Sequence, residues 1–135
     1  MAYVVHQKVL FKHCDPAGIV FYPRYFEMIN DCVEAFFCDV VKVPFEELLV
    51  NAGVPTAQIS ADFTAPSRHG DQLEIRVNPK SVGRSSLQLE FVGQCSEQAR
   101  FTANARLVYT DAAGKSAPWP DDMRARINGA MEEAK

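Results

Sequence analysis

An aspartate in a turn beside an apolar helix start is the feature of this sequence best suited to chemistry. Asp15 is followed by Pro16 and Gly18, which favour a turn, and an apolar, aromatic run begins at Ile19. A charge against apolar surroundings is costly unless it has a partner, so an aspartate in this place needs an explanation. A carboxylate in such a place can serve as a nucleophile or as a general base. The alternative is an aspartate that caps a helix or closes a turn.

A second group that could do chemistry is the neighbouring pair His13 and Cys14. A thiol activated by histidine is a nucleophile, but adjacent residues on a strand face opposite sides. We therefore expect Cys14 to be a small buried side chain and His13 to have a structural role. The four cysteines include no C-x-x-C pair and their spacing predicts no metal site. Reduced cysteines are typical of a cytoplasmic protein.

The elements that must position Asp15 are a strand before it and a helix after it. Alternation of side-chain character over residues 3–11 predicts the strand. From Tyr22 to Val40, apolar residues recur every three or four positions, which predicts a long and largely buried helix. Pro23 suits the first turn of this helix, where a missing N–H is no loss. A short helical piece is predicted over Phe45–Ala52.

The pattern changes to strict alternation after residue 56. Four strands are predicted, each with one apolar and one polar face, over 57–65, 73–78, 87–95 and 100–109. Antiparallel sheets typically have one packed and one solvated face. A modest helical pattern follows at Asp121–Glu133. The order predicts an α+β fold of one domain, residues 1–135, in which a five-stranded antiparallel sheet wraps around the long central helix.

Composition and charge weigh against several classes of protein. Hydrophobic residues make up 47% and charged residues 23% of the 135 positions, which is typical of a globular domain. The formal net charge is −3 and no Lys/Arg cluster appears, so we expect no nucleic-acid partner. The apolar runs are too short to span a bilayer, and Met1–Leu10 shows no signal-peptide pattern. We expect a cytoplasmic protein.

The stretch Cys14–Val20, with Tyr22-Pro23 and Tyr25 after it, resembles the hotdog-fold acyl-CoA thioesterases of the 4-hydroxybenzoyl-CoA thioesterase type. Pro66–Leu73 is a weaker match, similar to that family's turn between the second and third strands. The resemblance covers nearly the whole chain. It implies a hotdog fold and hydrolysis of a thioester between an acyl group and coenzyme A. No cofactor is implied, because coenzyme A is part of the substrate.

The same resemblance implies roles for individual residues. Asp15 matches the catalytic carboxylate, and the backbone N–H of Tyr22 matches the group that polarises the thioester carbonyl. Gly18 permits the turn or a close approach by the ligand. The acyl group is expected to contact Tyr25, Ile29, Asn30 and Phe63, and the nucleotide end of coenzyme A to contact Arg84, Ser86 and Lys80.

Asn30 leaves the acyl group open. Members of the family that act on hydroxybenzoyl groups can carry a carboxylate on this face of the helix, whereas Asn30 is neutral. We therefore expect the acyl group of the substrate to be either aromatic or short to medium aliphatic.

The resemblance also implies a homodimer, often doubled to a tetramer, with active sites at the subunit interface. Exposed edges of small sheets favour such pairing. Two other functions stay open. One is an acyl-thioester hydratase or dehydratase. Such enzymes typically need a histidine with an acidic partner over the pocket, whereas His6, His13 and His69 lie in strand or turn positions. The other is a non-catalytic acyl-CoA-binding protein.

Overall fold

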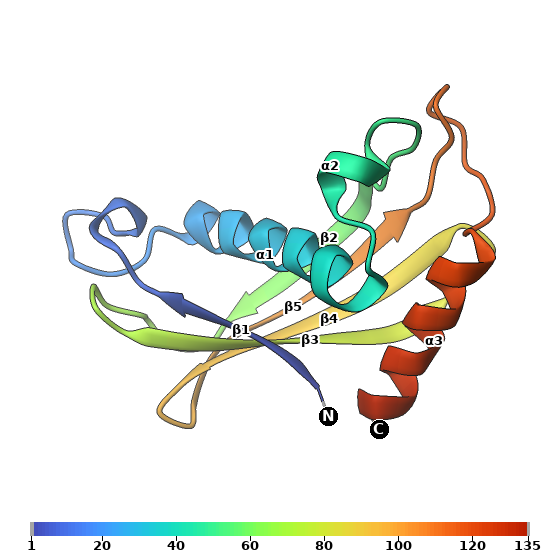
Figure 1. Cartoon of the computed structure of the whole chain (residues 1–135). Helices are drawn as coiled ribbons and strands as arrows, with labels where there is room; N and C mark the ends of the chain where they lie inside the picture. The colour runs from blue at the N-terminus through green and yellow to red at the C-terminus, as the bar shows by residue number, and fades with distance from the viewer. Residues whose placement is uncertain (1, 135) are drawn as a thin grey trace.

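One long helix lies across the concave face of a curved five-stranded antiparallel sheet in the computed structural model, which describes residues 2–134 (Figure 1). The strands pair in the order β1-β3-β4-β5-β2. This arrangement confirms the predicted α+β fold of a sheet wrapped around a central helix. The strands are β1 Tyr3–Lys8, β2 Thr56–Phe63, β3 Gln72–Val82, β4 Ser86–Cys95 and β5 Gln98–Val108.

The central helix α1 spans Tyr22–Phe36 and continues into a π-helical turn at Phe37–Val41. The buried side chains of α1 recur at helical spacing and face the sheet, while the acidic residues Glu27, Asp31 and Glu34 face outward. Burial of each large apolar side chain contributes about 1.5–3 kcal/mol, so the buried face fixes the helix on the sheet. The buried residues of α1 are Tyr25, Met28, Ile29, Cys32, Val33 and Phe36.

The predicted alternation holds for three of the four late strands. Every second side chain is buried throughout β4, in β3 as far as Pro79, and in β5 from Phe101 onward. The prediction of a packed apolar face is wrong for β2, where only Ala61 is even partly buried and Ile59 and Phe63 are exposed. The reason is position: β2 lies at the end of the strand order and pairs with β5 alone, so its other edge is unpaired within the described residues.

Some element boundaries differ from the prediction. The first strand ends at Lys8 rather than at residue 11, because Val9 N–H donates to Asp71 O and Phe11–His13 form a 3-10 turn. The third strand runs to Val82 instead of residue 78, with a register shift just after Pro79.

The short helix α2, Phe45–Leu48, ends before the predicted Ala52, since the chain turns there to pair Gly53 with Thr110.

The helix α3, Asp121–Ala134, covers one end of the sheet beside β3 (Figure 1). Met123 and Ile127 are its buried residues. Arg124 Nη2 donates to the carbonyl oxygens of Gly83 at 2.9 Å and Arg84 at 3.0 Å. These contacts tie α3 to the β3–β4 hairpin, at the end of β3 away from the loop between β1 and α1 (Figure 1). Among the described helices, none is long and apolar enough to cross a membrane.

Candidate active site

Asp15 occupies a tight loop closed by backbone hydrogen bonds. Its N–H donates to Ile19 O at 3.0 Å, its carbonyl accepts from Gly18 N–H at 2.9 Å, and Cys14 forms an antiparallel bridge with Val20. Gly18 has φ +80°, a conformation that other residues adopt at a cost. A Cβ at Gly18 would meet no atom within 4 Å, so backbone conformation and not space is what requires glycine there.

The Asp15 carboxylate uses one oxygen for the loop. Oδ1 accepts a hydrogen bond from Ala17 N–H at 2.8 Å, the bond expected of a turn aspartate. Within residues 2–134, Oδ2 accepts no hydrogen bond and forms no ion pair. The side chain is half-buried. The turn role and a chemical role are therefore compatible, because one bond orients the carboxylate and the second oxygen stays available.

The start of α1 leaves a backbone donor available beside this loop. Phe21, the N-cap residue, gives no side-chain cap, and its own N–H donates to His13 O at 2.9 Å. Pro23 has no N–H. Tyr22 N–H is therefore the first donor of the helix, and it has no acceptor among the described residues. Helix starts concentrate unpaired N–H groups and partial positive charge, which suits an oxyanion.

A hollow of about 260 Å³ adjoins the helix start. Phe63 stacks on Tyr25 with ring centroids 5.2 Å apart and contacts Tyr22 at 6.2 Å. Tyr25 is buried, its hydroxyl donates to Ser67 Oγ at 2.9 Å, and burial raises its pKa. The walls are thus largely apolar and aromatic. The lining residues are Ile19, Val20, Tyr22, Tyr25, Phe63, Thr64, Ala65 and Pro66.

A second hollow, of about 280 Å³, lies further along α1. The sequence assigned Tyr25, Ile29, Asn30 and Phe63 to one acyl pocket, but only Tyr25 and Phe63 line the first hollow. Ile29 and Asn30 line the second, and Phe63 of the first hollow meets Phe26 of the second edge to face, with ring centroids 6.2 Å apart. The lining of the second hollow is Phe26, Ile29, Asn30, Val33, Thr56, Ile59 and Ala105.

The His13–Cys14 pair is not arranged for nucleophilic chemistry. Buried His13 accepts a hydrogen bond at Nδ1 from Leu10 N–H at 2.9 Å, and Cys14 Sγ donates to Leu10 O at 3.6 Å. The two side chains thus bond the same backbone segment and not each other. Desolvation lowers the pKa of His13. Its geometry fits the structural role expected from the sequence.

The residues expected to meet coenzyme A lie at the other end of the sheet. Lys80, Arg84 and Ser86 belong to the β3–β4 hairpin, whereas the Asp15 loop lies beside the first residues of β3 (Figure 1). A strand of 11 residues is roughly 30 Å long. One chain therefore does not bring these three residues to its own Asp15. Lys80 Nζ lies 3.7 Å from Glu90 Oε1.

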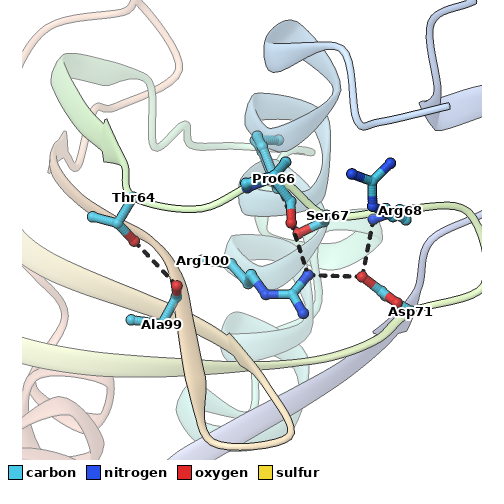
Figure 2. Close-up of polar contacts among 8 residues, drawn as sticks. Thr64, Pro66, Ser67, Arg68, Asp71, Ala99 and Arg100 are labelled. Carbon is cyan, nitrogen blue, oxygen red and sulfur yellow. Dashed lines mark hydrogen bonds and ion pairs between the residues drawn. The ribbon is translucent and has the colours of Figure 1, made fainter. Parts of the chain in front are cut away.

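Sequence reasoning missed a buried polar network behind the hollow (Figure 2). Arg100, taken as a residue of the polar face of its strand, is 9% exposed and pairs with Asp71 at 2.7 Å. Asp71 was the signal that could have indicated this pair, because an arginine is rarely buried unless a carboxylate pairs with it.

The chain is similar in sequence and in fold to known thioesterases. Residues 9–127 match the model of the thioesterase-like superfamily. The chain is 28% identical over 85 residues to the 4-hydroxybenzoyl-CoA thioesterase of Pseudomonas sp. (strain CBS-3), covering 61% of this chain and 60%, under two thirds, of that relative. It is 24% identical over 118 residues to the 1,4-dihydroxy-2-naphthoyl-CoA hydrolase of Nostoc punctiforme, covering 86% and 79% of the two chains.

Solved structures agree with these matches. A gentisyl-coenzyme A thioesterase superposes with a TM-score of 0.85 at 25% identity, covering 93% of this chain and 99% of the other. A 1,4-dihydroxy-2-naphthoyl-CoA thioesterase from Synechocystis has a TM-score of 0.86 at 19% identity, covering 95% and 96%, and shows the shared fold. Together these matches confirm the family resemblance.

Proposed function

The chain belongs to the thioesterase-like superfamily, and we propose that it is a thioester hydrolase that cleaves an acyl-CoA thioester to the free acid and coenzyme A. One observation carries this proposal. The Asp15 loop and the first N–H of α1 lie within one short hydrogen-bonded segment beside an aromatic hollow. A carboxylate oxygen and a backbone donor are thus both available where a thioester can bind. The reaction needs no cofactor, since coenzyme A belongs to the substrate.

In the proposed reaction, the thioester carbonyl oxygen accepts a hydrogen bond from Tyr22 N–H. As the carbonyl carbon becomes tetrahedral, negative charge gathers on this oxygen at the positive end of α1. A backbone donor so placed typically lowers the barrier by about 3 kcal/mol. Tyr22 therefore acts through its backbone, and its ring serves as a wall of the hollow.

Asp15 supplies the second half of the chemistry by one of two routes. In the first, a carboxylate oxygen attacks the carbonyl carbon, the C–S bond breaks, and coenzyme A leaves as a thiolate. Water then cleaves the mixed anhydride and restores Asp15. In the second, Asp15 takes a proton from a water whose oxygen attacks the carbonyl carbon. The C–S bond then breaks, coenzyme A leaves as a thiolate that takes up the proton, and Asp15 is ionised again. Both routes need the ionised carboxylate.

An aromatic acyl group is our first candidate for the hollow beside Tyr22. Tyr22, Tyr25 and Phe63 offer ring faces and edges, and aromatic rings pack favourably in offset or edge-to-face contact. The curated relatives are named for hydroxybenzoyl and dihydroxynaphthoyl thioesters. Ile29 and Asn30 would contact only an acyl group long enough to pass the Phe26–Phe63 contact. Short and medium aliphatic groups are the second candidates.

We propose that a second copy of the chain completes the site. The unpaired edge of β2 is available to pair with β2 of another copy, as exposed strand edges do. Lys80, Arg84 and Ser86 are too far from Asp15 of their own chain to meet the same substrate. In a dimer doubled to a tetramer, they can contact the coenzyme A phosphates bound at a neighbouring copy. Light scattering at micromolar concentration tests this, and a monomer would contradict it.

The test of the function is thiol release by the purified protein from a panel of aryl, short-chain and medium-chain acyl-CoAs. We expect release to be fastest with aryl thioesters. Phe63→Leu should raise the KM for aryl thioesters, whereas Phe11→Leu, at a residue 81% exposed and outside the hollow, should not. Tight binding without turnover of any member, or hydration of an enoyl-CoA in the same panel, would contradict the proposal.

A further inference from the structure

We propose that the ion pair between buried Arg100 and partly exposed Asp71 positions the active site, by holding the turn on which the Asp15 loop and the first turn of α1 rest. The inference depends on the proposed function for its catalytic consequence. Arg100 and Asp71 do not line the hollow, so they are positioning residues that act through the Pro66–Asp71 turn.

Arg100 binds the chain between β2 and β3 with its side chain (Figure 2) and also with its backbone carbonyl. Nη1 donates to Asp71 Oδ2 at 2.7 Å and to Pro66 O at 3.1 Å. The Arg100 carbonyl accepts from Thr64 N–H at 2.9 Å and Ala65 N–H at 3.3 Å. Thr64, Ala65 and Pro66 are one wall of the hollow. Arg100 of β5 therefore holds this wall of the hollow in place.

Asp71 locks the other side of the same turn. Its Oδ2 accepts from Arg68 N–H at 2.9 Å as well as from Arg100, and its own N–H donates to Arg68 O at 3.0 Å. The Arg68 N–H, and after it the Arg100 guanidinium, hold the pKa of Asp71 below its usual value. Gly70, with φ +95°, completes the turn and donates to Val9 O at 2.8 Å. The turn thus has one conformation while the pair is intact.

Ser67 transmits this order to the site. Its carbonyl accepts from Val20 N–H at 2.8 Å, and Ile19 forms an isolated bridge with Arg68. Its hydroxyl accepts from the buried Tyr25 hydroxyl at 2.9 Å. Val20 directly precedes the helix N-cap, and Tyr25 lies in the first turns of α1. Any shift of Ser67 must therefore move the segment between Asp15 and Tyr22.

Stability alone does not account for this pair. The Arg100 side chain is 10% exposed and loses hydration, while the Asp71 side chain is 28% exposed, and ion pairs whose charges lose hydration often contribute little net stability. Arg100 adds to the cost of desolvation, because its buried Nε has no partner among the described residues. What the pair supplies is a defined geometry for the turn. Misplacement of catalytic groups by about 1 Å can cost roughly 100-fold in rate.

The test compares Arg100→Met with Arg106→Met, a matched change at an exposed arginine of the same strand, and adds Arg100→Lys and Asp71→Asn. In Arg100→Met we expect kcat to fall about 10- to 100-fold with KM within threefold. Arg100→Lys should recover part of the loss. Hydrogen exchange of Val20 N–H should become at least tenfold faster, while Phe91 in β4 stays protected.

Addition of Asp71→Asn to Arg100→Met should cost less than the two single losses combined, because both changes break one interaction. If Arg100→Met does not fold, Arg100→Lys and Asp71→Asn carry the same comparison, with smaller expected losses. Unchanged Val20 exchange, or a kcat loss no larger than that of Arg106→Met, would overturn the inference. A wild type that hydrolyses no thioester would overturn the proposed function instead, and Val20 exchange would still decide whether the pair holds the turn.

Discussion

The two ends of β3 differ in how completely their polar groups are used. At the β3–β4 hairpin, the carbonyls of Gly83, Arg84 and Ser86 accept hydrogen bonds from Arg124 or Trp119. At the other end, the second oxygen of Asp15 and the N–H of Tyr22 have no protein partner in the described chain. At the hairpin, the backbone carbonyls are thus bonded by the chain's own side chains, whereas at the other end a carboxylate oxygen and a backbone N–H stay available for a ligand.

Exposed aromatic side chains follow the same division. Phe21 and Tyr22 are exposed beside the Asp15 loop, and Phe63 of the edge strand contacts Tyr22. At the hairpin end, Trp119 is buried among Phe37 and Tyr109. The end at Asp15 therefore has both the polar and the apolar surface that an acyl thioester would cover.

Removal of the available Tyr22 N–H should have a large effect on kcat. Tyr22→Pro deletes the backbone N–H, and proline is tolerated at the start of a helix, where Phe21 already has an extended conformation. We expect kcat to fall roughly 100-fold or more. Tyr22→Ala, which keeps the N–H and loses the ring, should affect mainly KM. Equal kcat values for the two variants would count against the backbone role.

Glycine substitutions at Gly18 and Gly129 should differ in their effects on activity and stability. Gly18→Ala forces alanine into φ +80°, which costs about 1–2 kcal/mol, and we expect about a tenfold loss of kcat. Gly129→Ala in α3 meets no atom within 4 Å and should stabilise the helix by up to about 1 kcal/mol. Thermal melts and steady-state kinetics measure both. A stable and fully active Gly18→Ala protein would contradict the account.

The hairpin end should affect stability and not chemistry. Arg124→Met removes two hydrogen bonds to the β3–β4 hairpin, and we expect a loss of about 1–2 kcal/mol in the free energy of unfolding. At saturating substrate, kcat should stay within twofold of wild type. Urea unfolding together with kcat checks this, and a large fall in kcat would show that the two ends are coupled.

The smallest expected effect is a loss of stability in mild acid. Because desolvation lowers the pKa of His13 in the fold, the neutral form is favoured there and accepts the Leu10 N–H. The stabilisation is complete above the ordinary pKa near 6.5 and is lost as pH falls through the lower folded pKa. Melting temperature should drop between pH 8 and pH 5, and less so in His13→Asn. The same drop in both proteins would assign the effect elsewhere.

Local patterns predicted most of the fold. Helical spacing after Tyr22 and alternation in β3–β5 identified the buried faces, because both periods reflect burial directly. The exposed β2 has the same alternation, and only its place at the sheet edge separates it from its neighbours. The 3-10 turn at Phe11–His13 is closed by His13 N–H donating to Leu10 O and by Leu10 N–H donating to His13 Nδ1, contacts that the alternation over residues 3–11 did not indicate.

The candidate site was predicted in part. Asp15, Gly18 and Tyr22 are close in sequence, so one turn and one helix start sufficed to bring them together. Arg100 lies in β5 and Asp71 in the turn before β3, and their contact depends on the β2–β5 pairing and the turn geometry. The division of the acyl residues between two hollows depends on the Phe26–Phe63 contact, which is likewise tertiary.

The most direct test of the central claim is kcat for thiol release by Asp15→Asn, at a temperature where the variant is fully folded. Asparagine can still accept the Ala17 N–H, so the loop should persist while the carboxylate is lost. We predict a fall in kcat of about 1,000-fold, with Asp121→Asn in α3 unchanged. Activity of Asp15→Asn within threefold of wild type would contradict the account.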